Sequence, residues 1–485
     1  MRQRLVTAEN KKWWTLAAVS VGLFVIMLDN TVVNVALPSM QRSLGMTLSE
    51  LEWVVAGYAL TFAAFMLTGG KLADLLGRRV VFMAGLLVFT AASLACGLAP
   101  NGGFLIGARV VQGLGAALMN PATLSIITAT FPPRQRGTAI GIWAGVSAMG
   151  LAIGPLVGGL LTQHVNWNWI FYINVPIGVV GLLAIPVLID ESRDMSHEQR
   201  PDVPGLLSSS VGLFALTYGL IEANNYGWSS GRILGAFAVG AVALAVFVLL
   251  ERQQRLPMLD LSLFRNRTFA GANTAMLFVG VAMFGLFFYV SLYMQQVLGF
   301  SPVQTGATFL PMTIVVILLA PPAGKLADRF GSRWLVGGGM TLLTLSLLWY
   351  AHLDANATFW GLLPGLLLGG VGMAATMTPT TAAAMSAVSI DKAGVGSAVL
   401  NSMRQVGGSL GIAVMGAIVA SVQSDSLRHG HARPEAYLAG FHDAVRVGAA
   451  ILFAGAIVAT LAIRKIEHRD EREAAEQRDL AAEAA

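Results

Sequence analysis

Cysteine is almost absent from this sequence, in which Cys96 is the only one among 485 residues. A single cysteine excludes a disulfide within the chain and any metal site built from a cysteine cluster. None of the seven histidines pairs with another at a spacing that suits a metal ion, so neither a metal nor a cofactor is expected. No nucleophile with a neighbouring base stands out, which argues against an enzyme.

Charge is scarce as well, at 12% of the residues, whereas 55% are hydrophobic. Soluble domains carry about 25% charged residues, and the mean hydropathy here is +0.67. These values predict an all-α integral membrane protein rather than a soluble one. The net charge of +5 would suit a nucleic-acid partner, but the positions of the basic residues, in alternate loops, argue against one.

Apolar runs of about 20 residues, long enough to cross a bilayer, recur along nearly the whole chain. The first is too long for a cleavable signal peptide, and no small-residue cleavage site follows it. The runs predict about fourteen spans, near residues 14–37, 50–70, 80–99, 104–126, 138–161, 168–189, 204–222, 233–250, 269–292, 305–323, 334–352, 358–384, 395–420 and 444–463.

Lysine and arginine gather in every second loop and near both ends of the chain, among them Lys71, Arg78, Arg79, Arg134, Arg136, Arg252, Arg265, Arg267, Lys325, Arg329 and Arg333. The intervening loops contain few. Because basic loops remain on the cytoplasmic side, both termini are predicted to be cytoplasmic. The protein is therefore expected in the inner (cytoplasmic) membrane as a multi-pass protein.

One acid, Asp29, lies within the first apolar run, in the stretch L-D-N-T-V-V-N-V-A-L-P of residues 28–38. A carboxylate at a helix centre costs about 2.5–3.5 kcal/mol on insertion scales and usually belongs to a proton or ion relay. The alternative is an acid that caps the helix end. Pro38, however, lies about 13 Å further along the helix axis, so we predict that Asp29 carries a proton.

Arg109 and Gln112 are three residues apart, and so share one face of the fourth apolar run. An arginine beside Asp29 would keep that carboxyl charged, whereas burial alone would favour its protonated form. Because a proton carrier needs both surroundings, Arg109 is predicted to take part in coupling. A static arginine, or one that reaches the membrane surface, is the alternative. A direct Asp29–Arg109 pair is left open.

A ten-residue pattern occurs twice, as G-K-L-A-D-L-L-G-R-R at residues 70–79 and as G-K-L-A-D-R-F-G-S-R at residues 324–333. Each copy lies in a basic loop between two apolar runs. The repeat predicts two six-helix halves with two inserted helices, a design in which substrate binds between the halves. The expected units are residues 1–190, the inserted residues 191–268, residues 269–464 and a cytoplasmic tail of residues 465–485.

This repeated loop resembles the signature loop of the major facilitator superfamily. The run G-x-x-x-G-P-x-x-G-G at residues 150–159 resembles the antiporter motif of its exporters. Residues 28–38 and the run N-W-N-W-I-F-Y-I-N-V-P-I-G at residues 166–178 are similar to the fourteen-span drug:proton antiporters. The resemblance covers nearly the whole chain and implies a proton-driven exporter, without specifying its substrate.

The acid of the repeated loop lies four residues before Arg78 in the first copy. It can pair with an arginine or a helix N-terminus, and such a cluster would hold the cytoplasmic side closed. Anchoring of the loop at lipid headgroups is the alternative. Because Ser332 replaces the arginine in the second copy, the first copy is expected to dominate. The gating residues are Gly70, Asp74, Gly77, Arg78, Arg79, Gly324, Asp328, Gly331 and Arg333.

The antiporter motif consists of Gly150, Gly154, Pro155, Gly158 and Gly159. Glycines spaced by four lie on one helix face and let another helix approach closely, and the proline can kink the helix. The resemblance implies a packed seam that prevents leakage during exchange. Ordinary helix packing is the alternative.

Helices one, four, nine and twelve should line the cavity if the halves pack as the resemblance implies. Aromatic and methionine side chains there would suit varied lipophilic ligands, whereas lipid-facing aromatics are the alternative. The predicted cavity residues are Asn34, Gln112, Met119, Asn120, Trp143, Phe284 and Phe288. Three buried polar candidates have no assigned role, namely Glu222, Asn401 and Arg404.

The favoured function is a proton-coupled antiporter that exports lipophilic, cationic or neutral drugs or antibiotics. Its expected partners are the small-molecule substrate, protons and the lipid bilayer, and it is expected to act as a monomer. An exporter of a lipid or another endogenous metabolite is the second hypothesis. A non-transporting sensor or an enzyme is the third, against which Asp29 and the complete gating loop argue.

Overall fold

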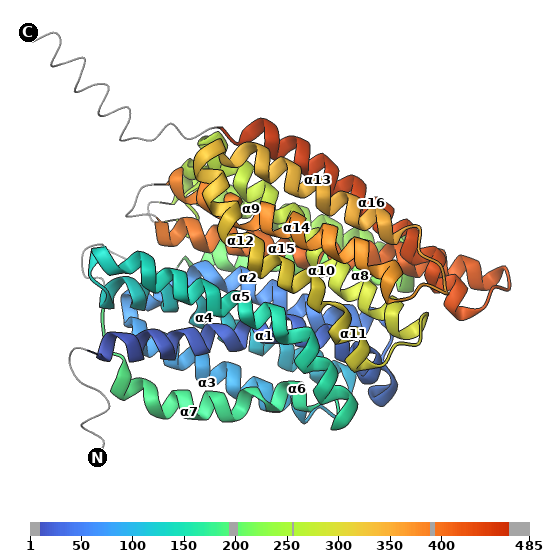
Figure 1. The fold of residues 1–485 in the computed structure, drawn as a ribbon, viewed down its shortest axis with the longest axis horizontal. Helices are drawn as coiled ribbons and strands as arrows, with labels where there is room; N and C mark the ends of the chain where they lie inside the picture. Colours follow the sequence, from blue (N-terminus) through green and yellow to red (C-terminus); the bar gives the residue numbers. More distant parts are fainter. Residues whose placement is uncertain (1–9, 194–201, 255–256, 389–392, 465–485) are drawn as a thin grey trace, which may run out of the picture.

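The computed structural model describes residues 10–193, 202–254, 257–388 and 393–464, and these ranges contain helices and no strand. Figure 1 shows long helices lying side by side in one bundle. Thirteen of the described helices are long and apolar enough to cross a membrane. A further pass is α13 (Ser332–Tyr350), which Arg333 and three glycines make less apolar. The prediction of an all-α membrane protein with about fourteen spans is confirmed.

The N-terminal half comprises α1 to α7. Within it, α1 packs on α5, and α4 packs on both α2 and α3. The sixth pass is divided near Ile173 into a short helix and a longer one. The elements are α1 (Lys11–Leu44), α2 (Leu48–Leu76), α3 (Arg78–Gly97), α4 (Gly102–Thr130), α5 (Pro133–His164), α6 (Trp169–Tyr172) and α7 (Asn174–Leu188).

Two helices, α8 (Val203–Tyr226) and α9 (Gly231–Gln253), follow as an inserted pair. They pack against each other, and α8 also contacts α2 and α15. Most of α9 is exposed, as expected of a helix whose apolar side chains face lipid. The inserted pair therefore lies beside the two halves and touches both of them.

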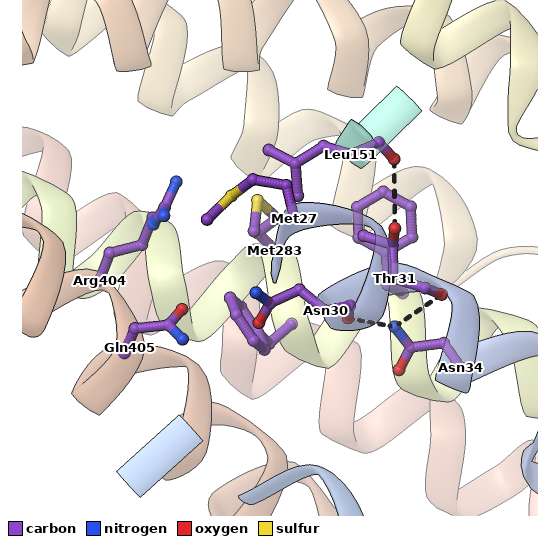
Figure 2. Close-up of a pocket in the computed structure, with 10 residues that line it drawn as sticks. Met27, Asn30, Thr31, Asn34, Leu151, Met283, Arg404 and Gln405 are labelled. Carbon is purple, nitrogen blue, oxygen red and sulfur yellow. Dashed lines mark hydrogen bonds between the residues drawn. The ribbon is translucent and has the colours of Figure 1, made fainter. Parts of the chain in front are cut away.

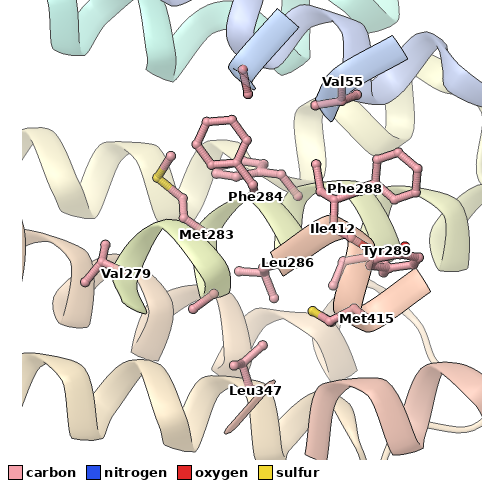
Figure 3. Close-up of a cluster of buried hydrophobic side chains, with 14 of the residues drawn as sticks. Val55, Val279, Met283, Phe284, Leu286, Phe288, Tyr289, Leu347, Ile412 and Met415 are labelled. Atoms are coloured by element: carbon pink, nitrogen blue, oxygen red, sulfur yellow. Dashed lines mark hydrogen bonds between the residues drawn. The ribbon is translucent and has the colours of Figure 1, made fainter. Parts of the chain in front are cut away.

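The C-terminal half comprises α10 to α16, preceded by the short helix η2 (Leu261–Arg265). Its core surrounds α10, where Leu286 and Tyr289 pack with Met415 and Leu347, and Val55 of α2 reaches the same cluster (Figure 3). The elements are α10 (Arg267–Gln296), α11 (Pro302–Thr308), α12 (Leu310–Phe330), α13, α14 (Phe359–Ser386), α15 (Ala393–Arg428) and α16 (Arg433–Ala462).

The repeated loop has the same geometry in both copies. Gly77 ends α2 with a φ of 115°, and Gly331 ends α12 with a φ of 84°. Residues that carry a Cβ atom rarely adopt such backbone angles. The backbone N–H of each glycine donates to a carbonyl four residues earlier. The glycine therefore stops one helix and turns the chain into the next in each half.

The basic loops gather at one end of the bundle, where α1 begins and α16 ends (left in Figure 1). Since lysine- and arginine-rich loops stay inside the cell, this is taken as the cytoplasmic end and the opposite end as the outer one. The predicted tail of residues 465–485 lies outside the described residues.

Cysteine labelling tests this orientation. Ser229 lies between α8 and α9 at the outer end, and Ser262 lies in η2 at the cytoplasmic end; both are exposed. In a Cys96→Ala background, a membrane-impermeant maleimide should label Ser229→Cys in intact cells and should label Ser262→Cys only after lysis. The reverse pattern would overturn the assigned topology.

Candidate functional site

Asp29 and Arg109 form an ion pair inside the N-terminal half, with 2.5 Å between Oδ2 and Nη1. At most 1% of either side chain is exposed. Gln112 donates from Nε2 to Oδ1 of Asp29 at 2.9 Å, and Asn174 of α7 donates to the same oxygen at 3.3 Å. Both carboxylate oxygens therefore accept hydrogen bonds, and the contact that the sequence left open is present.

Arg109 is held on its other sides as well. Its Nε donates to the carbonyl of Val54 at 3.0 Å, and its Nη1 donates to Oε1 of Gln112 at 2.7 Å. The guanidinium lies 4.2 Å from the ring centre of Tyr58 and 5.7 Å from that of Phe171, within the range of cation–π attraction. Removing one partner of such a buried pair leaves an uncompensated charge and typically costs about 3–5 kcal/mol.

A cavity lies between the halves, with α1 and α5 on one side and α10 and α15 on the other (Figure 2). Asp29 does not belong to its lining, because the carboxylate is directed to α4 and α7. The described residues that line it include no acid, and they are Met27, Asn30, Thr31, Asn34, Leu151, Met283, Phe284, Phe287, Arg404 and Gln405.

The structure places the predicted cavity residues in three different surroundings. Asn34 and Phe284 line the cavity, whereas Gln112 belongs to the Asp29 cluster. The remaining four lie in packed surroundings: Met119 beside Phe82, Asn120 buried in α4, Trp143 donating to Thr123 at 3.0 Å, and Phe288 beside Tyr289 in the cluster of Figure 3.

In the first gating loop, Asp74 accepts hydrogen bonds from Arg78 at 3.0 and 3.1 Å. Arg78 also donates to the carbonyl of Ser125 on α4 at 3.3 Å. The backbone N–H of Arg79 donates to Glu191 at 3.1 Å, and its guanidinium lies 3.7 Å from the same carboxylate. These contacts join the loop to α4 and to the end of α7. Glu191, which follows the sixth apolar run, was not singled out from the sequence.

The second gating loop makes a smaller set of described contacts. The guanidinium of Arg333 lies 5.0 Å from the ring centre of Trp334, and the side chain of Asp328 lies outside the described residues. The first glycines of the two copies occupy matching places: Gly70 faces Pro121 on α4, and Gly324 faces Thr378 on α14.

Lys71 connects the first loop to the segment between α9 and η2 by donating to the carbonyl of Pro257. Beside it, Asp202 accepts from the backbone N–H groups of Gly205 at 2.8 Å and Met258 at 3.3 Å. Burial opposes the charge on Asp202, but these hydrogen bonds and those with the side chains of Gln254 and Glu251 outweigh it and lower the pKa of the carboxyl. The inserted helices are therefore fastened to the gating loop at the cytoplasmic end. The sequence offered one signal, since Lys71 lies within the repeat.

The antiporter glycines contact two different helices. Gly150, Gly154 and Gly158 face α1, and a Cβ on Gly158 would lie 2.5 Å from the carbonyl of Val32. Gly159 instead faces the carbonyl of Pro302 on α11, and Gly306 of α11 faces that of Pro155. One face of α5 thus packs within its own half, and a neighbouring face packs across to the other half.

The two halves also meet between α1 and α10 near the outer end. Ser291 donates to the carbonyl of Asn34 at 2.9 Å, and Gln295 donates to that of Val35 at 2.9 Å. Closer to the outer end of α1, Gln296 donates to Gln41 at 3.0 Å. Together with the α5–α11 contact, these bonds close the cavity toward the outer end.

Glu52 of α2 is a buried acid that sequence reasoning missed, with 2% of its surface exposed. The hydroxyl of Tyr289, from the other half, lies 3.1 Å from its Oε1 and 2.8 Å from the carbonyl of Ile412. The neighbouring Trp53 donates to Glu222 on α8 at 3.3 Å. The available signal was an acid within the second apolar run, placed too near its end to attract notice.

The other two uncertain candidates lie on α15. Asn401 donates to the carbonyl of Ser397 one turn earlier at 3.1 Å, a bond within its own helix. Arg404, with 8% of its surface exposed, lines the cavity.

The sequence pattern of the family described as Major Facilitator Superfamily matches residues 19–412. The Tetracenomycin C resistance and export protein of Streptomyces glaucescens is 38% identical over 415 residues, which cover 86% of this chain and 77% of that protein. The Multidrug resistance protein Stp of Mycobacterium tuberculosis is 38% identical over 414 residues, covering 85% and 77%. The Puromycin resistance protein pur8 of Streptomyces alboniger is 36% identical over 413 residues, covering 84% and 82%.

Two solved structures share the fold at low identity. An inward-facing, unoccupied bacterial homologue of the human lysosomal transporter Spinster has a TM-score of 0.67 and 18% identity, covering 94% of this chain and 98% of that one. An auto-inhibited POT family peptide transporter has a TM-score of 0.69 and 15% identity, covering 95% and 98%. At these identities the likeness concerns the fold alone.

Proposed function

This chain belongs to the major facilitator superfamily, and from that premise we propose that it is a proton-coupled antiporter that exports lipophilic drugs or antibiotics by alternating access. The names of its relatives support this class of substrate, since they include resistance to tetracenomycin C, to puromycin and to several drugs. The protein is a multi-pass membrane transporter rather than an enzyme.

The buried Asp29–Arg109 pair is the observation that carries proton coupling. A proton on Asp29 would remove the charge that holds Arg109, and α4 could then shift relative to α1. The residues after Asp29, Asn30 and Thr31, line the cavity, so a shift of α1 would reach the substrate directly. Asp29 is thus a titratable group that acts on the cavity wall through its own helix and does not itself touch the drug.

The driving force is adequate for such an exchange. One charge moved across 100 mV supplies about 2.3 kcal/mol. Because about 1.4 kcal/mol corresponds to a factor of ten, one proton sustains roughly a 50-fold gradient of a neutral drug before any pH difference is added. A single titrating carboxyl is therefore sufficient for export.

The expected preference for cationic drugs loses its basis in this geometry. An acid on the first helix could have attracted a cation, but the Asp29 carboxylate is bonded to Arg109, Gln112 and Asn174 and does not line the cavity. The cavity offers Met27, Met283 and aromatic side chains instead, which suit lipophilic ligands.

Proteoliposomes test the proposed function. With an imposed pH gradient, addition of a lipophilic antibiotic, beginning with tetracenomycin C and puromycin, should produce proton movement opposite to drug movement, recorded with a trapped pH dye. Drug movement without proton movement would contradict antiport. Failure to move any antibiotic, together with movement of a lipid, would instead favour the alternative of a lipid exporter.

The two gating loops should differ in importance. Asp74→Asn removes a part-buried, charge-assisted bond to Arg78, typically worth about 1.5–3 kcal/mol. We expect drug export to fall about tenfold. Asp328→Asn should have a smaller effect because Ser332 stands where the first copy has Arg78. Export is compared at equal protein density, and an equal or larger loss in Asp328→Asn would contradict the ranking.

A further inference from the structure

Arg404 is the one charged residue among the described residues that line the cavity. Its side chain is 8% exposed, and its Nε is buried without a hydrogen-bond partner. Within the described part of the chain, no carboxylate forms an ion pair with it. Figure 2 shows its guanidinium beside the cavity, with no bond to the other residues drawn. The cavity therefore contains a buried positive charge for which the described residues supply no counter-ion.

A buried charge without a partner raises the free energy of the protein, because burial removes the water around it and no protein group takes the place of that water. Asp29 supplies Arg109 with a close counter-ion, and no described residue does the same for Arg404. A guanidinium binds a carboxylate or another flat oxyanion through two parallel hydrogen bonds. An acidic ligand would thus supply what the described residues do not.

The remaining unpaired polar groups of the cavity are sorted by side, with a donor on α15 and acceptors on α1. On the α15 side, Nε2 of Gln405 is a buried donor without a partner. On the α1 side, Oδ1 of Asn30 and Oδ1 of Asn34 are buried acceptors without partners, since their amide nitrogens donate to helix carbonyls. Donors therefore face acceptors across the cavity, and the methionine and phenylalanine side chains lie between them.

We propose that this cavity selects lipophilic aromatic weak acids. The carboxylate or phenolate of the ligand pairs with Arg404 and Gln405, its rings contact Phe284 and Phe287, and a hydroxyl or N–H group on its far side donates to Asn30 or Asn34. This assignment rests on the transport function proposed above and adds the charge of the substrate to it.

The charge of the substrate also decides how the membrane potential acts on transport. Exchange of one proton for a monocation moves no net charge, exchange for a neutral drug moves one, and exchange for a monoanion moves two. An interior-negative potential favours both proton entry and anion exit, so each 100 mV contributes about 2.3 kcal/mol twice. An acidic substrate would make export the most sensitive to the potential.

Binding of three fluorescent probes with one ring system tests the proposal. Anthracene-9-carboxylic acid, its primary amide and 9-(aminomethyl)anthracene differ in charge but little in shape. On the purified full-length protein, the acid should bind about tenfold or more tightly than the amide, as one charge-assisted bond of about 1.5–3 kcal/mol implies, and the amine should bind most weakly. Equal binding of the three would overturn the proposal.

Variants of Arg404 locate the preference. Arg404→Gln should weaken binding of the acid about tenfold and leave the amide within about twofold, whereas Arg404→Lys should retain part of the preference. The matched control is Arg428→Gln, which changes an exposed arginine on the same helix and should leave all three affinities unchanged. Undiminished preference for the acid in a folded Arg404→Gln protein would show that another group recognises the ligand.

The binding measurement needs no proton gradient, so its failure is separate from failure of the proposed function. If drugs exchange for protons in vesicles but the acid is not preferred, the assignment to Arg404 is wrong and antiport stands. If the acid binds through Arg404 but no probe moves protons, the coupling is wrong and the binding site stands.

Discussion

Asp29→Asn should abolish drug-driven proton movement in proteoliposomes and leave ligand binding in place. Asparagine keeps the size of the side chain and can still bond to Gln112, but it cannot take up or release a proton. Exchange should therefore fall to the level of protein-free vesicles. Because Asp29 does not line the cavity, the affinity for a neutral ligand should change by less than about threefold, or 0.7 kcal/mol.

The control for this variant must separate coupling from stability, since Asp29→Asn leaves the buried Arg109 without its counter-ion. The double variant Asp29→Asn/Arg109→Gln removes both charges, which costs less than removing one of them, and should fold without coupling. Asp29→Glu should keep part of the activity. Asp443→Asn, at an exposed acid of α16, should behave as the unchanged protein. Normal drug:proton exchange in Asp29→Asn would remove Asp29 from the mechanism.

Gly159→Ala is expected to reduce drug export by roughly tenfold, which corresponds to about 1.4 kcal/mol. A methyl group on Gly159 would overlap with the carbonyl oxygen of Pro302 on α11. The overlapping atom is backbone, so a rotamer change cannot relieve it, and overpacking typically costs about 1–3 kcal/mol. The added methyl group therefore opposes closure of the outer end, which requires the α5–α11 contact. An outward-open state does not need this contact and is not opposed.

Gly145→Ala is the matched control in the same helix, because a Cβ on Gly145 meets nothing within 4 Å. An exposed glycine-to-alanine change in a helix stabilises it by about 0.5–1 kcal/mol, and transport should remain unchanged. Outer closure can be followed in a Cys96→Ala background with Ser291→Cys, a position buried at the outer α1–α10 contact. Maleimide labelling there should increase in Gly159→Ala and not in Gly145→Ala. The opposite pattern would show that this seam does not limit closure.

The spans and the repeated turn could be predicted from the sequence because hydropathy and glycine placement are local properties. The breaks within passes could not: the sixth pass divides near Ile173, and the tenth begins with the separate helix α11. A proline follows each break within the first turn of the next helix, Pro176 in α7 and Pro311 in α12. Other prolines, such as Pro38 in α1 and Pro121 in α4, lie inside continuous helices, so proline alone did not distinguish a break.

The orientation of side chains was harder to predict than their depth. Asp29 and Arg109 were placed at similar depths, but a helix that is apolar on all sides gives no indication of its rotation. Asp29 lies on the first helix, which was expected to line the cavity, but its carboxylate faces α4. Glu52 was overlooked because an acid near a helix end is ordinary at a membrane surface. It is buried only because α10 and α15, distant in sequence, cover it.

Arg404 could be recognised from the sequence as an unusual residue, but whether it has a charged partner could not. Whether a buried charge has a partner depends on every helix packed around it, and the acids nearest in sequence give no information about that. That no described residue pairs with it became visible only when α1, α5, α10 and α15 were placed together around one cavity.

The number of hydrogens available at the contact between Tyr289 and Glu52 depends on the protonation of Glu52. The Tyr289 hydroxyl has one hydrogen but lies within bonding distance of two oxygens, that of Ile412 at 2.8 Å and that of Glu52 at 3.1 Å. A peptide carbonyl can only accept, so each contact has a hydrogen of its own only if the Glu52 carboxyl supplies the second one. Where α2 meets α10, two oxygens at the closed outer end therefore share a single hydrogen whenever Glu52 is ionised.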